Sequence, residues 1–319
     1  MMQVLITGAL GYMGGRITQH LSHRKDMVLR LTAKARPAAR SHCQPHTEII
    51  YGDILSDADN AAACAGIDCI IHLAALNEID SLENPERALE VTTGGTLKLL
   101  MAAQRAGVKR FIYFSTAHVY GTPLAGHISE KTVPRPTHPY AITHRAAEDF
   151  VLAEHAKKNV EGIVLRLSNA VGAPCDVAVN RWSLVVNDLC VQAVTHKKLV
   201  LKSPGTQYRD FVSVHNVCRI VEHVIGLPSE KVGDGLFNVG GKASVQIRQM
   251  AEMIADRCQV TLGFRPSLHI PDAQSVIDST IERLDYDVEK LLSTGYVLSG
   301  DLKTEIDETL VMCQRSFGQ

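Results

Sequence analysis

The sequence has little of several features that would narrow its function. Its 319 residues carry a formal net charge of only −1, so electrostatics gives no reason to expect a nucleic acid or a membrane surface as a partner. No apolar run reaches the length of a transmembrane helix, and no basic region precedes the first apolar segment. We therefore expect neither a membrane span nor a signal peptide. Internal repeats and low-complexity linkers are also lacking.

The eight cysteines are scattered, without a C-x-x-C pair or the spacing of a disulfide framework. Such usage suits a reducing compartment, and we expect a cytoplasmic protein. The segment from His42 to His46 contains residue types that bind metals, but it offers no fourth ligand nearby. We therefore expect no metal site.

The most informative segment lies at the start of the chain. An apolar run at 3–7 ends in glycines at positions 8, 11 and 14, and a helical pattern follows at once. Such a loop lets backbone N–H groups and a helix N-terminus meet a pyrophosphate. A strand, turn and helix without a ligand is the alternative, but the position directly after a strand favours dinucleotide binding.

The first half of the sequence alternates strand and helix patterns. Strand-like runs lie at 3–7, 27–32, 47–51, 68–73, 110–115 and 161–167, and the clearest helices between them at 85–106 and 139–157. Repeated β-α units with continuous apolar strands predict an α/β fold with a doubly wound parallel Rossmann sheet. We expect residues 1–168 to form this dinucleotide-binding domain, joined by part of 205–240. Residues 169–319, with helices at 181–196 and 244–257, would form mostly a smaller α/β substrate-binding lobe.

Further segments then establish a resemblance to a known family. They are Gly52-Asp53-Ile54-Leu55, His72-Leu73-Ala74-Ala75, Phe114-Ser115-Thr116-Ala117-His118-Val119-Tyr120-Gly121 and Pro139-Tyr140-Ala141-Ile142-Thr143-His144. Together with the glycine loop, they resemble the extended short-chain dehydrogenase/reductase family, in particular its nucleotide-sugar epimerases, dehydratases and reductases. The resemblance covers nearly the whole chain and continues through 165–169, 205–212 and 237–241.

The resemblance implies roles for individual residues. Asp53 would accept a hydrogen bond from the adenine amino group, with Ile54 beside the ring. Tyr140 would be the general acid/base, and Thr116 would hydrogen-bond the same substrate oxygen. The remaining residues expected to line the dinucleotide site are Gly8, Gly11, Tyr12, Met13, Gly14, Leu73, Ala74, Ala75, Thr92, Ser115, His144 and Leu167.

Two residues are expected to meet a nucleotide sugar. By the resemblance, Asn169 and Arg209 would contact it, with Arg209 at the diphosphate, where a planar guanidinium binds oxygens in pairs. Arg209 could instead form a surface ion pair with Asp210, which would contribute little. Asp53 likewise could be a turn or N-cap residue.

Two positions depart from the family pattern. The motif is usually Tyr-x-x-x-Lys, and here His144 stands in place of the lysine, one helical turn from Tyr140. A lysine about 5 Å from the phenol would be worth roughly 3 kcal/mol, or about two pKa units. Histidine is mostly neutral at pH 7. Thr92 stands where many relatives carry an asparagine, so both changes affect the expected proton-transfer network.

The cofactor and the reaction are predicted less sharply. The segment after the second strand has no acid for the ribose hydroxyls but has Lys34 and Arg36, which favours NADP, with NAD open. Ala117 and His118 replace the Asp-Glu pair of the dehydratases, so elimination of water is not expected.

The leading hypothesis is an NAD(P)-dependent epimerase or keto-reductase acting on a nucleotide-activated sugar. The alternatives are a dinucleotide-binding protein with weak or no catalysis and a reductase of a non-sugar carbonyl. The resemblance also implies a homodimer, formed through the helices at 85–106 and 139–157.

Overall fold

The computed structural model describes residues 1–34, 47–271 and 282–318. Within this part of the chain, seven strands form the main sheet, and all neighbouring strands are parallel. In spatial order they are β11 (Leu236–Val239), β7 (Glu161–Leu167), β5 (Arg110–Thr116), β4 (Cys69–His72), β1 (Met2–Thr7), β2 (Met27–Ala33) and β3 (Thr47–Tyr51). The predicted doubly wound parallel sheet is confirmed, and β11 extends it beyond the six predicted strands.

The strand order reverses between β1 and β4, since the chain first builds outward to β3 and then continues on the other side of β1. All residues of β4 and β5 are buried, because helices cover both faces of the sheet. In such sheets a crevice opens at the carboxyl ends of the strands where the order reverses. The fold therefore places the ends of β1 and β4 beside the expected ligand site.

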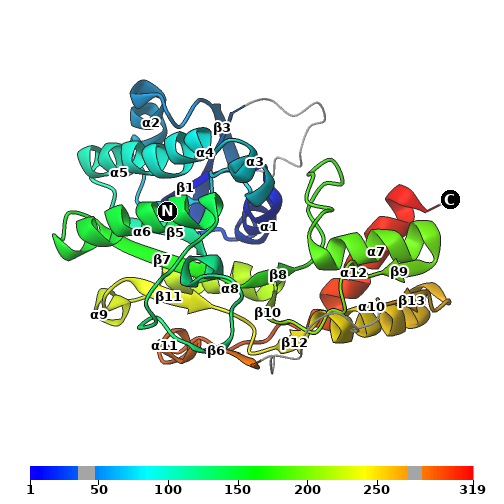
Figure 1. The fold of residues 1–319 in the computed structure, drawn as a ribbon. Helices are drawn as coiled ribbons and strands as arrows, with labels where there is room; N and C mark the ends of the chain where they lie inside the picture. The colour runs from blue at the N-terminus through cyan, green and yellow to red at the C-terminus, as the bar shows by residue number, and fades with distance from the viewer. Residues whose placement is uncertain (35–46, 272–281, 319) are drawn as a thin grey trace.

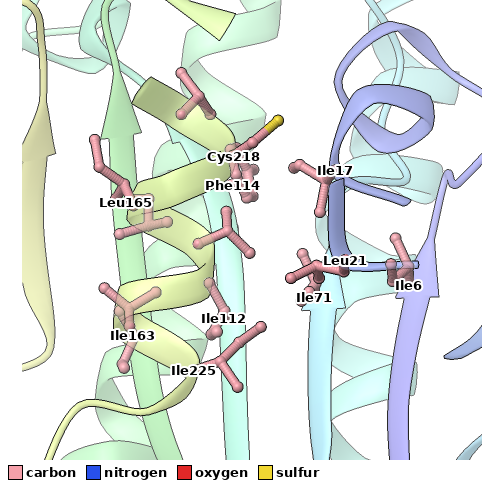
Figure 2. Close-up of a cluster of buried hydrophobic side chains, with 14 of the residues drawn as sticks. Ile6, Ile17, Leu21, Ile71, Ile112, Phe114, Ile163, Leu165, Cys218 and Ile225 are labelled. Atoms are coloured by element: carbon pink, nitrogen blue, oxygen red, sulfur yellow. The ribbon is translucent and has the colours of Figure 1, made fainter. Parts of the chain in front are cut away.

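Helices α1 (Tyr12–Leu21) and α8 (Val214–Ile225) cover one face of the sheet. Figure 2 shows Ile17 and Leu21 of α1 and Cys218 and Ile225 of α8 in one cluster with apolar side chains of the central strands. Helices α2 (Asp57–Cys64), α5 (Gly95–Ala106) and α6 (Pro139–Ala156) cover the opposite face. The predicted helix at 85–106 consists of α4 (Pro85–Ala88), a π-helical turn η1 (Leu89–Gly94) and α5.

A second apolar core lies beside the sheet domain, among α7 (Val185–His196), α10 (Ile247–Leu262) and α12 (Leu302–Phe317). These helices stand to the right of the main sheet in Figure 1. Three short strands accompany them in the order β12 (Ser244–Gln246), β10 (Tyr208–Ser213) and β8 (Asn169–Val171). The remaining elements are α3 (Glu78–Glu83), η2 (Ala117–Tyr120), β6 (Gly126–Ile128), β9 (Lys198–Val200), α9 (Ser229–Val232), β13 (Ser267–His269), β14 (Leu284–Tyr286) and α11 (Glu289–Leu292).

Two predicted helices begin later than expected. The helix predicted at 181–196 begins at Val185, because Leu184 is extended and caps α7. The helix predicted at 244–257 begins at Ile247, because Ser244–Gln246 pairs with β10 as an antiparallel strand. In the second case a tertiary strand pairing outweighs the local helical pattern.

Candidate active site

The loop from β1 to α1 needs its glycines for close packing. Gly8 has a φ of +66°, and a Cβ there would lie 3.0 Å from the backbone nitrogen of Ala74. A Cβ on Gly14 would lie 2.2 Å from the carbonyl oxygen of Gly8. The N-cap, Gly11, gives α1 no side-chain hydrogen bond. No side chain therefore caps the first turn of α1, and its backbone N–H groups are available to bind a phosphate.

Three cavities follow the carboxyl ends of the strands and share lining residues, so they form one groove. The β3 cavity is lined by Lys34, Asp53, Ile54, Ala74, Ala75 and Gly8. The glycine-loop cavity continues past Gly8, Gly11, Tyr12, Met13, Gly14, Leu73, Ala75, Ser115, Tyr140, His144 and Leu167. The Tyr140 cavity adds Thr116, Asn169 and Arg209. The groove thus brings together most of the residues predicted from separate motifs.

At the β3 end, Asp53 has two contacts. Its Oδ1 accepts the backbone N–H of Leu55 at 3.0 Å, and its Oδ2 lies 3.8 Å from the Lys34 ammonium. Ser56, not Asp53, is the N-cap of α2. Asp53 therefore combines the turn role with a position in the cavity wall, and Lys34 is 72% exposed, free to meet a second anion.

Tyr140 stands where the glycine-loop cavity meets the Tyr140 cavity. Pro139 occupies the first turn of α6, and His138 caps the helix by accepting the N–H of Tyr140 at 3.2 Å. Burial raises the pKa of the Tyr140 phenol well above its usual value, and the carboxylate of Glu78 adds to this. Arg181 and the hydroxyl of Thr116 act in the opposite direction. A proton on this phenol is therefore held firmly until a ligand changes its surroundings.

His144 packs edge-on against Tyr140, with ring centroids 4.5 Å apart. Its Nδ1 lies 2.7 Å from the hydroxyl of Tyr113, while its Nε2 is buried without a hydrogen-bond partner. Burial lowers the pKa of His144 to about 4. The side chain is therefore neutral at pH 7, and it supplies no positive charge to Tyr140.

At the far end of the groove, Arg209 has no ion pair within the described residues. Its predicted alternative partner, Asp210, is 1% exposed and accepts hydrogen bonds from Ser168 and from the backbone N–H groups of Gly241 and Ala243. The surface ion pair considered from the sequence is therefore absent. Burial lowers the pKa of Arg209, but an arginine stays charged. Arg209 is therefore a cation in the wall of the Tyr140 cavity, without an ion-pair partner among the described residues.

Of the predicted site residues that the structure describes, Thr92 does not line the groove. Thr92 is fully buried in η1 and its hydroxyl accepts the N–H of Leu76 at 3.3 Å, behind the groove. Arg36 lies outside the described residues, as does the histidine and cysteine segment at 42–46. In the part of the chain that the structure describes, no group of His, Cys, Asp or Glu is arranged to hold a metal ion.

The groove also contains an ion pair that the sequence did not single out. Glu78 of α3 and Arg181 form an ion pair with a distance of 3.1 Å, and both line the Tyr140 cavity. His118, whose pKa is lowered by burial, lies beside them. Residues 78 and 181 are more than 100 positions apart, so no sequence spacing could have paired them.

A larger apolar cavity, of about 740 Å³, lies between α1 and α12 and includes Leu10, Val311 and Met312 in its lining. It contains none of the three predicted catalytic residues. No helix within the described residues combines the length and the apolar character that crossing a membrane requires.

Comparisons with known proteins agree with the predicted resemblance. The model of the NAD dependent epimerase/dehydratase family matches residues 4–240. The chain is 26% identical over 269 residues to a UDP-glucose 4-epimerase of Streptomyces lividans, with 78% of this chain and 79% of the relative covered. It is 37% identical over 181 residues to the 3 beta-hydroxysteroid dehydrogenase/Delta 5→4-isomerase of Mycobacterium tuberculosis, with 53% of this chain and 47% of the relative covered.

Solved structures agree over the whole chain. MoeE5 in complex with UDP-glucuronic acid and NAD matches with a TM-score of 0.80 and 25% identity, over 99% of this chain and 100% of that chain. The UDP-glucuronic acid 4-epimerase of Bacillus cereus in complex with NAD has a TM-score of 0.83 at 21% identity, over 99% and 97% of the two chains. The latter is a likeness of fold. The predicted family and fold class are thus confirmed.

Proposed function

The chain belongs to the NAD dependent epimerase/dehydratase family, and we propose that it is an NAD(P)-dependent epimerase or keto-reductase of a nucleotide-activated sugar. The observation that carries the proposal is the position of Tyr140. It stands between a cavity bounded by the glycine loop and a cavity lined by Arg209, which has no ion pair in the part of the chain that the structure describes. A proton-transferring phenol at that junction is suited to a substrate that lies next to a dinucleotide.

The residues present fit a dinucleotide. The glycine loop leaves a cradle that a Cβ at Gly8 or Gly14 would fill. His144 lines the same cavity, and its Nε2 is a buried polar atom with no hydrogen-bond partner among the described residues. The bound cofactor would supply the hydride acceptor or donor. The glycine loop would hold the pyrophosphate, and the wall from Leu73 to Ala75 would let the cofactor lie close to the sheet.

Tyr140 and Thr116 would then carry out the proton transfer. Thr116 would hydrogen-bond the reacting oxygen, and Tyr140 would take its proton during oxidation and return it during reduction. Burial raises the pKa of Tyr140, and the neutral His144 supplies no positive charge that would lower it again. Deprotonation of Tyr140 in the free enzyme is therefore unfavourable at neutral pH. We therefore expect a rate optimum above neutral pH. His144→Lys should move that optimum to lower pH.

Arg209 and Asn169 support a diphosphate-linked substrate. An unpaired, partly buried guanidinium is costly unless an anion meets it, and a diphosphate supplies paired oxygens. The S. lividans relative is named as a UDP-glucose epimerase and MoeE5 is titled with UDP-glucuronic acid. These names support a nucleotide sugar as the substrate class. We further propose that residues 169–319 supply most of this binding lobe.

We propose NADP as the preferred cofactor, with NAD also possible. No acid follows β2, and the exposed ammonium of Lys34 borders the β3 cavity. A 2′-phosphate there would gain a cation, whereas a ribose diol would lack the usual carboxylate. MoeE5 is titled with NAD, so the two cofactors should be compared directly on this chain.

We also propose a homodimer. Large apolar side chains are exposed together on adjacent helical segments: Ile79 and Leu82 of α3, Leu89 of η1, and Ile142 and Phe150 of α6 are 40–60% exposed. Such a patch is typical of a protein interface. Light scattering at micromolar concentration should give the mass of a dimer, and Phe150→Glu should shift it toward the monomer. A monomeric mass for the unaltered protein would refute this part.

A thermal-shift screen tests the central proposal. Nucleotide sugars should raise the melting temperature further when NADP or NAD is present, since only the native state binds them. Arg209→Met should remove the sugar-nucleotide response and leave the cofactor response. Turnover is then followed by cofactor absorbance and product analysis. Cofactor binding without turnover on any nucleotide sugar would instead favour a binding protein without catalysis.

One observation favours a second candidate, a reductase of a non-sugar carbonyl. The partial match to a hydroxysteroid dehydrogenase is 37% identical, above the 26% for the epimerase, although it covers 53% of this chain. If no nucleoside diphosphate shifts the melting temperature, steroid and other ketone substrates become the next panel.

A further inference from the structure

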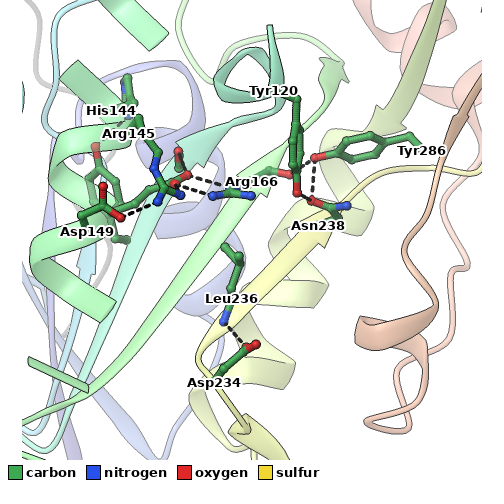
Figure 3. A network of polar contacts seen from close by, with 12 residues as sticks. Tyr120, His144, Arg145, Asp149, Arg166, Asp234, Leu236, Asn238 and Tyr286 are labelled. Atoms are coloured by element: carbon green, nitrogen blue, oxygen red, sulfur yellow. Dashed lines mark hydrogen bonds and ion pairs between the residues drawn. The ribbon is translucent and has the colours of Figure 1, made fainter. Parts of the chain in front are cut away.

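The hydroxyl of Tyr113 and the ring of His144 form a buried pair under the groove. Tyr113 lies on β5 and is 1% exposed, and its hydroxyl is 2.7 Å from Nδ1 of His144, which is 4% exposed. Figure 3 shows His144 on α6, directly before Arg145, with Asp149 further along the same helix. The mechanism proposed above uses His144 but gives Tyr113 no role.

The direction of this hydrogen bond follows from the neighbouring groups. The Tyr113 phenol keeps its proton, because burial and the nearby carboxylate of Glu148 raise its pKa. That proton needs an acceptor. Thr96 also lies near the phenol, but its own proton goes to the carbonyl of Thr92. Thr96 therefore cannot donate to Tyr113.

A second chain of hydrogen bonds restricts Thr96 further. The Thr7 hydroxyl oxygen accepts the N–H groups of Leu73 and Ala74, so its proton goes to Nδ1 of His72 at 2.6 Å. His72 then donates from Nε2 to Thr96 at 2.9 Å. Since the Thr96 oxygen already accepts this bond, Nδ1 of His144 is the better acceptor for Tyr113.

If Nδ1 accepts, a neutral His144 carries its proton on Nε2. Among the described residues that nitrogen is buried without a hydrogen-bond partner, and the His144 side chain belongs to the lining of the glycine-loop cavity. The backbone of Phe114 contacts the ring and partly offsets the lowering of the His144 pKa by burial. In the Nε2–H tautomer the side chain carries an N–H donor in the wall of the cavity.

We propose that Tyr113 is a positioning residue that fixes His144 in the Nε2–H tautomer, so that a neutral donor hydrogen-bonds a ribose hydroxyl of the bound dinucleotide. The identity of the ligand, a dinucleotide, rests on the proposed function, whereas the tautomer of His144 does not. In the family motif a lysine occupies this position. A neutral N–H donor on His144 would replace the hydrogen bond of that lysine but not its positive charge.

The tautomer can be measured in the protein without cofactor. In ¹⁵N-histidine-labelled protein, long-range proton–nitrogen spectra distinguish the protonated ring nitrogen from the bare one, and the signals missing from His144→Gln identify His144. We expect the proton on Nε2 in the wild type. In Tyr113→Phe we expect a mixture of tautomers or a proton on Nδ1. A wild-type proton on Nδ1 would overturn the proposal, and this result needs no variant of Tyr113 to fold.

Cofactor affinity gives the second readout. Tyr113→Phe should weaken dinucleotide binding about two- to tenfold, the size of one neutral hydrogen bond. Tyr296→Phe is the matched control, because it removes a buried phenol that contacts Asn216 away from the groove. Its affinity should equal that of the wild type.

A pair of variants at position 144 separates the two nitrogens. Glutamine places an amide N–H near Nε2, and asparagine places one near Nδ1, so His144→Gln should retain more affinity than His144→Asn. Equal losses in both, or unchanged affinity in Tyr113→Phe, would contradict the positioning role. If the wild type binds neither NAD nor NADP, the proposed function fails while the tautomer measurement still stands.

Discussion

Neutralising Glu148 should destabilise the protein strongly, because it leaves a buried guanidinium without a carboxylate. Glu148 of α6 is 0% exposed and Arg166 of β7 is 1% exposed. Two hydrogen bonds join them, Nε to Oε1 at 3.0 Å and Nη2 to Oε2 at 2.7 Å. Figure 3 shows Arg166 between Arg145 and Asp149 on one side and the cluster of Tyr120, Asn238 and Tyr286 on the other.

The magnitude follows from burial and from the remaining partners. Removing one partner of a buried ion pair costs about 3–5 kcal/mol, and we expect this for Glu148→Gln. Arg166 cannot turn to water, and its Nη1 already lacks a partner. Arg166→Met should cost less, because Glu148 keeps the hydroxyl of Ser115 and the guanidinium of Arg145 at 3.2 Å. Replacing both residues with methionine should be less harmful than Glu148→Gln.

Equilibrium urea unfolding of the wild type, the two single variants and the double variant measures these differences. Arg145→Met is the matched control, since Arg145 is 30% exposed and also contacts Asp149. It should lose about 1 kcal/mol or less. A Glu148→Gln variant within about 1 kcal/mol of the wild type would refute the reasoning, as would a double variant less stable than Glu148→Gln.

Four further outcomes are expected. Gly11→Val should abolish the thermal shift with NAD or NADP, because the backbone must approach the pyrophosphate; retained affinity would contradict this. Lys34→Ala should weaken NADP roughly tenfold in a binding titration and leave NAD unchanged; equal effects would show that Lys34 does not meet a 2′-phosphate. Arg209→Met should raise the KM for a nucleotide sugar at least tenfold with cofactor affinity unchanged, checked by steady-state kinetics. Burial lowers the pKa of His72 to about 3 and of His144 to about 4, so both side chains bind protons more readily in the unfolded state. The free energy of unfolding should therefore fall as the pH drops from ~6.5 to ~4, by up to about 1.4 kcal/mol per pH unit for each histidine. His144→Gln should reduce that slope in pH-dependent unfolding.

Local sequence pattern was sufficient for most of the sheet domain. Apolar runs predicted six strands to within about one residue. The signal is strongest for central strands such as β4 and β5, which are buried on both faces. The glycine loop was partly local: the close approach of Gly14 to Gly8 follows from their spacing, whereas Gly8 also packs against the backbone of Ala74. The sequence pattern gave a wrong prediction at Ser244–Gln246, where a helix was expected and the segment instead pairs with β10 as a strand.

The motifs also placed Tyr140, Thr116, Asn169 and Arg209 on one groove, because the carboxyl ends of parallel strands meet at one edge of the sheet. Their catalytic and binding roles stay predictions. The charges that surround them did not follow from the motifs. Whether Asp210 would pair with Arg209 depended on β10 packing beside Gly241 and Ala243, which no local spacing encodes.

By itself, then, the sequence determined the strands, the turn that can receive a pyrophosphate and the order of the motifs, because these depend on residues a few positions apart. Only the tertiary structure decided which side chains face each other across elements. It set Tyr113 of β5 against His144 of α6, Glu78 against Arg181, and Glu148 against Arg166. Such pairs depend on where each helix lies on the sheet and on its rotation about its own axis. Both are set by the packing of the whole core rather than by any single segment.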